Sequence, residues 1–205
     1  MSMTGATSMA FRSFWVALGA VVSLSGCVSI GRGGDEPADQ LFTLTATTMA
    51  PAGAEAQGNP ASALAVTEPG VPQYLDELRV PVQINANAIA YLQDAFWIEK
   101  PARLFQRMLT ETIRAASTRL VVGGGDLEYA AQTQLGGELL AMDYDATRGA
   151  VIVRYDAVLR LPDGTLRTHR FESEITGVAP DALSVGPALN RAANDVAAQV
   201  AAWIG

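Results

Sequence analysis

The fold of this chain is decided by one stretch, AVIVRYDAVLRL at residues 150–161, which the turn sequence PDGT follows at 162–165. Apolar or aromatic residues recur at every second position, and charged residues are frequent between them. This alternation is typical of a strand with one buried and one solvated face. The Asp-Gly pair predicts a tight hairpin turn into a following strand. One face holds Val151, Val153, Tyr155, Ala157, Leu159 and Leu161, and the other holds Ile152, Arg154, Asp156, Val158 and Arg160.

Strand-like segments at 134–144 and 166–175 flank this stretch and predict an antiparallel meander. A helix is predicted over 101–118, because Pro101 suits a first helical turn and an apolar stripe follows at helical spacing. A second helix is predicted over 184–204. We therefore expect an α+β fold, with two main helices packed on one face of a largely antiparallel sheet. The stripes are Leu104, Met108, Leu109, Ile113 and Ala116 in the first helix, and Val185, Leu189, Ala192, Val196, Val200 and Trp203 in the second.

Shorter segments predict the remaining strands. Residues 41–46, 63–67 and 80–85 are each expected to form a strand, and 88–92 is expected to pair with 95–99 as a hairpin. A short strand is also expected at residues 120–122. The three glycines that follow it are interpreted as a turn and not as a phosphate-binding loop, because no Lys-Ser/Thr pair follows and no helix is expected to start there.

The N-terminus has the three parts of an export signal. Arg12 precedes an apolar run over 14–24, which is too short for a permanent membrane span of roughly 20 residues and has the length of a signal-peptide core. Two small residues then precede a cysteine, the only one in the chain. The motif resembles the lipobox of bacterial lipoproteins, and residues 1–27 are predicted to be a lipoprotein signal peptide. The lipobox consists of Leu24, Ser25, Gly26 and the lipidated residue Cys27.

The resemblance implies a covalent S-diacylglycerol and an N-acyl group on Cys27. Three acyl chains anchor a protein effectively permanently, whereas one chain binds only reversibly. By resemblance to the sorting of such lipoproteins, Val28 at the next position implies the outer membrane, whereas an aspartate there would imply retention in the inner membrane. Gly-rich, polar residues 28–40 are predicted to be a flexible tether, and residues 41–205 a single α+β domain that faces the periplasm.

Composition argues against several classes of function. The formal net charge of −7 does not suit binding to nucleic acid. His169 is the single histidine, so a site with two histidine ligands is impossible. The pairs Asp143/Asp145 and Glu172/Glu174 are interpreted as solvated strand faces rather than as general acids and bases. No catalytic residues, metal site or cofactor are predicted, and the chain is not expected to be an enzyme.

The middle of the chain carries a family resemblance. An Arg-initiated strand at Arg79 is followed by a strand with Tyr91, and then by Trp97, Glu99 and the helix that starts at Pro101. In this order and spacing, residues 40–204 resemble the ABC-type transport auxiliary lipoprotein family, the PqiC-like proteins. The segment 188–196, ALNRAANDV, resembles the end of that family.

The resemblance implies an auxiliary subunit of a transporter that pairs an ABC ATPase and permease with an MCE-domain protein and moves lipids between the two membranes. The implied partner is the periplasmic MCE-domain protein, and Tyr91, Trp97 and Glu99 are candidate partner-binding residues. The aromatic residues are also candidates for the core, where Trp97 would wedge the helix onto the sheet. Two alternatives stay open: the domain binds lipid in a cavity of its own, or it is a purely structural envelope lipoprotein.

Overall fold

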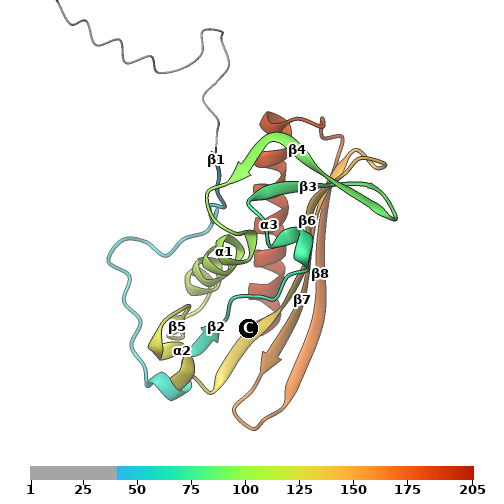
Figure 1. The fold of residues 1–205 in the computed structure, drawn as a ribbon. Helices are drawn as coiled ribbons and strands as arrows, with labels where there is room; N and C mark the ends of the chain where they lie inside the picture. The colour runs from blue at the N-terminus through green and yellow to red at the C-terminus, as the bar shows by residue number, and fades with distance from the viewer. Residues whose placement is uncertain (1–40) are drawn as a thin grey trace, which may run out of the picture. The chain divides into compact units, whose positions relative to one another are not determined.

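Eight strands form one sheet, and the two long helices α1 and α3 pack against one of its faces (Figure 1). The computed structural model describes residues 41–205, so the predicted signal peptide, Cys27 and the tether at 28–40 lie outside the described residues. The strands are β1 (Leu41–Phe42), β2 (Leu64–Val66), β3 (Arg79–Asn85), β4 (Ala88–Trp97), β5 (Val121–Val122), β6 (Thr133–Asp145), β7 (Ala150–Arg160) and β8 (Leu166–Thr176). The helices are α1 (Pro101–Ala116), α2 (Asp126–Ala130) and α3 (Ala182–Ile204), with single 3-10 turns η1 (Pro60–Ser62) and η2 (Gln73–Leu75).

The meander of β6, β7 and β8 confirms the prediction made from residues 150–161. β7 pairs antiparallel with β6 on one side and with β8 on the other, in registers that run along almost the whole of each strand. The apolar face of β7 is buried against the helices. Its other face carries cross-strand ion pairs, Arg154 with Glu172 and Asp156 with Arg170. The predicted division into one buried and one wet face is therefore correct for most of β7.

The opposite edge of β6 carries two short parallel ladders. β2 pairs with one end of β6 at Leu64↔Thr133, and β3 pairs with the other end at Val82↔Tyr144. β5 then adds to β2 in parallel, and β1 adds to β4 in parallel. The predicted largely antiparallel sheet is present in its three long ladders, β3–β4, β6–β7 and β7–β8, whereas the four short ladders are parallel.

The core fills the space between the sheet and the two helices. Phe105 of α1 and Tyr155 of β7 meet edge to face, with their ring centroids 5.2 Å apart. Both predicted apolar stripes are in the core except Ala116, which is exposed at the end of α1, and Trp203, which is half-buried. The largest fully buried side chains include Trp97, Tyr155, Phe105, Leu64, Leu75, Leu104, Met108, Leu109 and Ile113.

Residues 88–99 do not form the predicted hairpin. They contain one continuous strand, β4, which pairs antiparallel with β3. Between Arg79↔Phe96 and Pro81↔Tyr91 the register shifts, and Asp94 has a positive φ of 52°. The residues that break the alternation in the sequence therefore form a bulge within one strand, and bulges of this kind bend a strand without ending it.

Residues 41–46 are not one strand, as predicted, because only Leu41–Phe42 pairs in the sheet. The chain then turns onto α3, where two asparagines hold it. Asn190 accepts a hydrogen bond from the Thr45 amide at 2.8 Å, and Asn194 accepts one from the Thr47 amide at 2.7 Å. Asn194 also donates to the Thr45 carbonyl. These side-chain bonds replace the ladder bonds that a longer strand would have made.

The expected absence of a helix after the three glycines is also wrong. The short helix α2 starts at Asp126, directly after Gly125. Gly125 is its N-cap and has a positive φ of 86°. A glycine run gives no apolar periodicity, so a single helical turn beyond it leaves little signal in the sequence.

Candidate partner-binding site

The three residues predicted to bind a partner occupy three different environments. Tyr91 is half-buried on β4, Trp97 is buried at the end of the same strand, and Glu99 lies just before α1. The structure therefore does not assemble them into one surface, although nine residues of sequence span all three.

Trp97 belongs to the core. Its side chain is 1% exposed and meets Phe42 edge to face, with ring centroids 5.8 Å apart. The indole Nε1 is the one buried side-chain nitrogen or oxygen in the described part of the chain without a hydrogen-bond partner. Burial therefore assigns Trp97 to the core, the alternative that the sequence left open.

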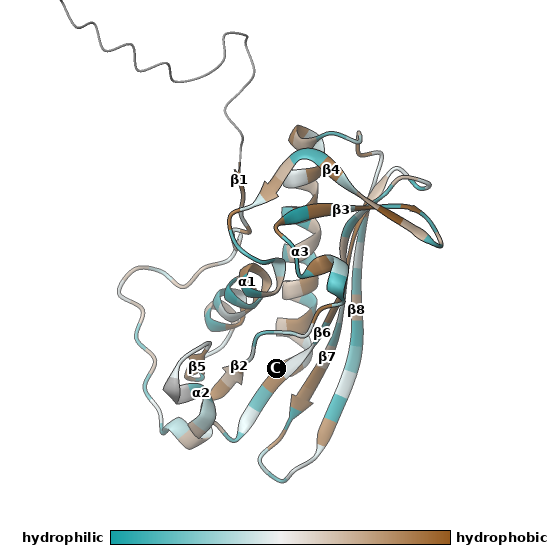
Figure 2. Ribbon diagram, in the orientation of Figure 1, coloured by the Kyte–Doolittle hydropathy of each residue, from teal (hydrophilic) through white to brown (hydrophobic). Residues whose placement is uncertain are grey.

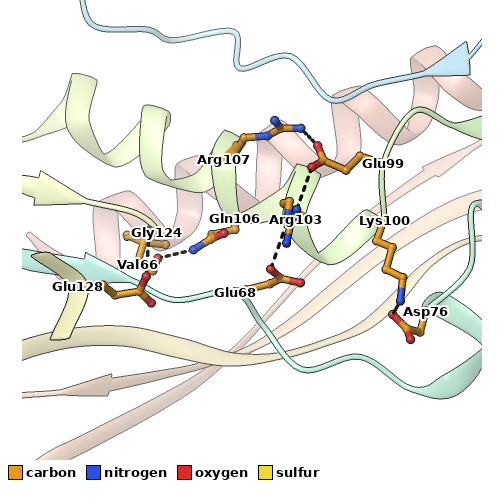
Figure 3. A network of polar contacts seen from close by, with 10 residues as sticks. All are labelled: Val66, Glu68, Asp76, Glu99, Lys100, Arg103, Gln106, Arg107, Gly124 and Glu128. Carbon is orange, nitrogen blue, oxygen red and sulfur yellow. Dashed lines mark hydrogen bonds and ion pairs between the residues drawn. The ribbon is translucent and has the colours of Figure 1, made fainter. Parts of the chain in front are cut away.

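Glu99 anchors a network of charges on the exposed side of α1 (Figure 3). It forms ion pairs with Arg103 at 3.4 Å and with Arg107 on the next turn. Arg103 also lies 3.5 Å from the carboxylate of Glu68, which follows β2. Both arginine side chains are more than half exposed, so these ion pairs stabilise the fold little.

These side chains line a groove open to solvent, with a volume of about 440 Å³. Hydrogen bonds to the backbone hold the elements around this groove, one of them buried. Gln106 donates from Nε2 to the Val66 carbonyl at 2.8 Å and so connects α1 to β2. At the far side the Gly124 amide donates to Glu128 at 2.9 Å. We call this surface the charged groove: it consists of Glu68, Glu99, Arg103, Gln106, Arg107, Gly123, Gly124 and Glu128.

Tyr91 lies apart from the charged groove. The guanidinium of Arg79 on β3 stacks on its ring, 4.6 Å from the centroid, and its hydroxyl donates to the Tyr74 carbonyl at 3.4 Å. Cation–π contacts of this kind add about 0.5–1 kcal/mol where solvent has access. Arg79 and Tyr91, both quoted for the family resemblance, therefore fasten β3, β4 and η2 together.

Asp143 differs from the prediction of a solvated strand face. It is 5% exposed, whereas Asp145 is half-buried at the strand end. Burial raises the pKa of the Asp143 carboxyl to about 6, although the nearby positive charge of Arg154 lowers it. Burial and the charge of Asp143 raise the pKa of Tyr74 to about 12. No three His, Cys, Asp or Glu side chains gather to hold a metal within residues 41–205.

Comparison with known proteins shows the family of this domain. The model of the ABC-type transport auxiliary lipoprotein component family matches residues 42–201, nearly the whole described domain. The chain belongs to this family. The family is one of transport auxiliary lipoproteins and not of enzymes, and a lipoprotein of this kind is associated with a membrane of the cell envelope. Within the described residues of this auxiliary lipoprotein, no helix is long and apolar enough to span a membrane.

Solved structures share the fold of the auxiliary lipoprotein. A Xanthomonas campestris protein of the DUF330 family superposes with a TM-score of 0.62 at 18% identity, covering 80% of this chain and 93% of that one. An uncharacterized protein gives a TM-score of 0.61 at 17% identity, covering 71% and 93%.

One curated protein matches a part of the sequence. It is sulfate adenylyltransferase subunit 1 of Methylorubrum populi, 33% identical over 133 residues. The match covers 55% of this chain and only 27% of that protein, so the activity of the adenylyltransferase does not carry over.

Proposed function

We propose that this protein is the lipid-anchored auxiliary subunit of an ABC transporter with an MCE-domain component, and that it acts by protein–protein contact. The transporter would move lipids between the inner and outer membranes. The lipids on Cys27 would hold the domain on the periplasmic side of the outer membrane, where it would meet the MCE-domain protein. Membership of the auxiliary lipoprotein family is the observation that carries this proposal.

The packing between sheet and helices supports protein contact over the alternative of lipid carriage. A cavity for an acyl chain would have to lie between the layers, where Phe105, Tyr155 and their neighbours are fully buried and in contact. Protein interiors packed in this way hold few voids larger than a water molecule. The charged groove, in contrast, is open and offers side chains of both signs.

The charged groove is the surface that we assign to the MCE-domain protein. Its ion pairs are exposed, so a partner can exchange them for pairs of its own at little cost in stability. Complementary charges at an interface raise the association rate and exclude wrong partners. Glu99 is thus the predicted site residue that remains available for a partner, and Arg103 and Arg107 were not predicted from the sequence.

The test is co-purification from detergent-solubilised envelopes of the native bacterium. The full-length tagged protein should recover an MCE-domain protein identified by mass spectrometry. Arg107→Glu should lower this recovery severalfold, because it places a negative charge beside Glu99. Arg160→Glu makes the same change at an exposed position at the end of β7 and should leave recovery unchanged. Repeated isolation of the protein alone, while other envelope complexes stay intact, would contradict the proposal.

A further inference from the structure

The end of the domain at which the described chain begins carries two open hollows. β1, the first turn of α3 and the β3–β4 hairpin lie together there (Figure 1). A hollow of about 350 Å³ lies between Leu41 and Leu183, and one of about 580 Å³ lies between Ile84 and Leu183. Leu183 therefore stands between the two hollows, and it is 68% exposed.

Large aliphatic side chains gather around these hollows. Ile84, on β3 near the β3–β4 turn, lines the larger hollow and is 44% exposed. Figure 2 shows hydrophobic residues along this hairpin and at the start of α3. Single exposed aliphatic residues are normal, but a group of them marks an interaction surface. We call this surface the apolar end: it consists of Leu41, Ile84 and Leu183.

The length of chain before Leu41 indicates what covers the apolar end. Thirteen residues, 28–40, separate Cys27 from Leu41. A Gly-rich chain of this length has a root-mean-square span of about 20 Å, and its upper limit is about 45 Å. A domain of this size has a radius of gyration of about 15 Å, hence a diameter of about 40 Å. A lipid on Cys27 thus keeps this end of the domain closer to the bilayer than the opposite end.

We propose that the apolar end rests on the phospholipid surface into which the Cys27 lipid inserts. The inference rests on the lipid anchor of the proposed function. The three side chains are all aliphatic, which suits burial at the boundary between headgroups and acyl chains. The anchor makes this contact intramolecular, so even weak partition of a few side chains is occupied most of the time. The domain then has a fixed orientation, with the β7–β8 turn and α2 directed into the periplasm.

Charge decides which lipid surface fits. In the described part of the chain, the residues that line the two hollows include Asp94 and Asp181 and no lysine or arginine. Contact therefore depends on aliphatic burial and not on attraction to anionic headgroups. It should persist on zwitterionic lipid and at high salt, unlike the contact of a basic membrane-binding helix.

A single introduced thiol tests the proposal in the full mature protein. Cys27 is the only cysteine, and lipidation consumes its thiol, so Leu183→Cys creates one labelling site for an environment-sensitive fluorophore. The matched control is Leu166→Cys, because the Leu166 side chain is 60% exposed. Leu166 is the first residue of β8, and Thr176 is the last residue of this strand before the chain continues to α3. The two ends of a strand of this length lie about 30 Å apart.

The labelled lipidated proteins are reconstituted on phosphatidylethanolamine vesicles with and without phosphatidylglycerol. The probe at 183 should shift to the blue, brighten severalfold and be quenched by brominated acyl chains in both vesicles, whereas the probe at 166 should report water. An acylated protein whose 183 probe stays in water overturns the proposal alone. Burial of that probe only after a protein partner is added assigns the apolar end to the partner and also overturns it. Unacylated Cys27, seen by mass, overturns both this proposal and the anchor.

Discussion

The two edges of β6 are built in different ways. Along one edge β7 and β8 follow through short turns, in antiparallel registers that are almost continuous. Along the other edge β2 and β3 attach by two short parallel ladders, although β2 lies more than sixty residues before its partner in β6. The comparison teaches that one half of the sheet is specified by local alternation, whereas the other half depends on contacts between distant residues.

The second half is fastened by buried or half-buried polar side chains that bond to the backbone. Gln106 of α1 forms a hydrogen bond to Val66 of β2, and Asn194 of α3 forms hydrogen bonds to the segment that follows β1 in the sequence. Tyr74 donates to the Leu140 carbonyl of β6 at 2.8 Å. Short strands offer few ladder bonds and little apolar surface, so these side chains supply the contacts that set their position.

The largest expected effect lies in the meander, at Gly137. Its φ is 131°, and an added Cβ would overlap the carbonyl of Asp156 on β7. Gly137→Ala should therefore separate β6 from β7 locally and cost about 4 kcal/mol or more, because backbone cannot move aside as a side chain can. Urea unfolding of the mature protein measures the loss.

The matched control for that change is Gly164→Ala in the β7–β8 turn. Gly164 also has a positive φ, of 86°, but an added Cβ meets no atom within 4 Å. This variant should cost only about 1 kcal/mol, the strain of a left-handed residue. Equal losses in the two variants would show that backbone conformation, and not the approach of β7, makes glycine necessary at 137.

The next effect lies in the other half, at Asn194. Its side chain is 7% exposed and bonds to Thr45 and Thr47. Asn194→Ala should cost about 2–4 kcal/mol, because it removes several part-buried hydrogen bonds at once. Hydrogen exchange should accelerate in residues 41–47 before it changes in β7 and β8. Asn190→Ala, which removes one partly exposed bond, should cost about 1 kcal/mol, and an equal loss in both variants would contradict the importance of burial.

The smallest expected effect is a gain in stability, for a substitution at Asp143. The Asp143 carboxyl has a pKa of about 6 in the fold and 3.8 as its ordinary value. Between these pH values the unfolded chain has lost the proton that the folded chain keeps, so stability falls as pH rises from about 4 to 6 and stays lower above. Asp143→Asn should therefore stabilise the protein at pH 7 by about 1–3 kcal/mol.

Chemical unfolding at two pH values checks this prediction. The gain of Asp143→Asn should be nearly absent at about pH 3, because this pH lies below both pKa values and both states of the wild type are then largely protonated. A matched substitution, Asp145→Asn, should lose stability at pH 7 instead. The hydrogen bond from Thr147 lowers the pKa of Asp145, so its charged form is favoured in the fold. A gain from Asp143→Asn that is equal at both pH values would contradict the assignment of a buried charge.

Sequence reasoning predicted the elements whose signal is local and repeated. The meander, α1 and α3 were predicted within a few residues, because alternation and helical spacing extend over ten or more positions. It was wrong where a pattern is broken by a bulge, as at Asp94, or where a segment is held by side chains, as at Thr45. Burial of Asp143 was missed because its cover, the η2 segment with Tyr74, lies about seventy residues away in the chain.

The candidate site divides in the same way. Glu99 could be found from its place before a helix, but Arg107, its ion-pair partner, and Glu68, which shares Arg103 with it, come from different elements and share no motif with it. The apolar end joins β1, the β3–β4 hairpin and α3, whose residues lie far apart in the sequence. Exposed aliphatic residues such as Leu183 cannot be told from core residues by hydropathy alone.

The sequence by itself determined the fold class, the order of the main elements and the family, because these depend on periodicity and on the order of residues along the chain. It also predicted the lipidation of Cys27, a chemistry that depends on a short contiguous motif. Only the tertiary structure decided that Trp97 is core, that Asp143 is buried and that Leu183 is exposed. The physical reason is that the burial of a side chain depends on which distant segments of the chain cover it. The short parallel ladders of β2 and β3 with β6 bring those segments together.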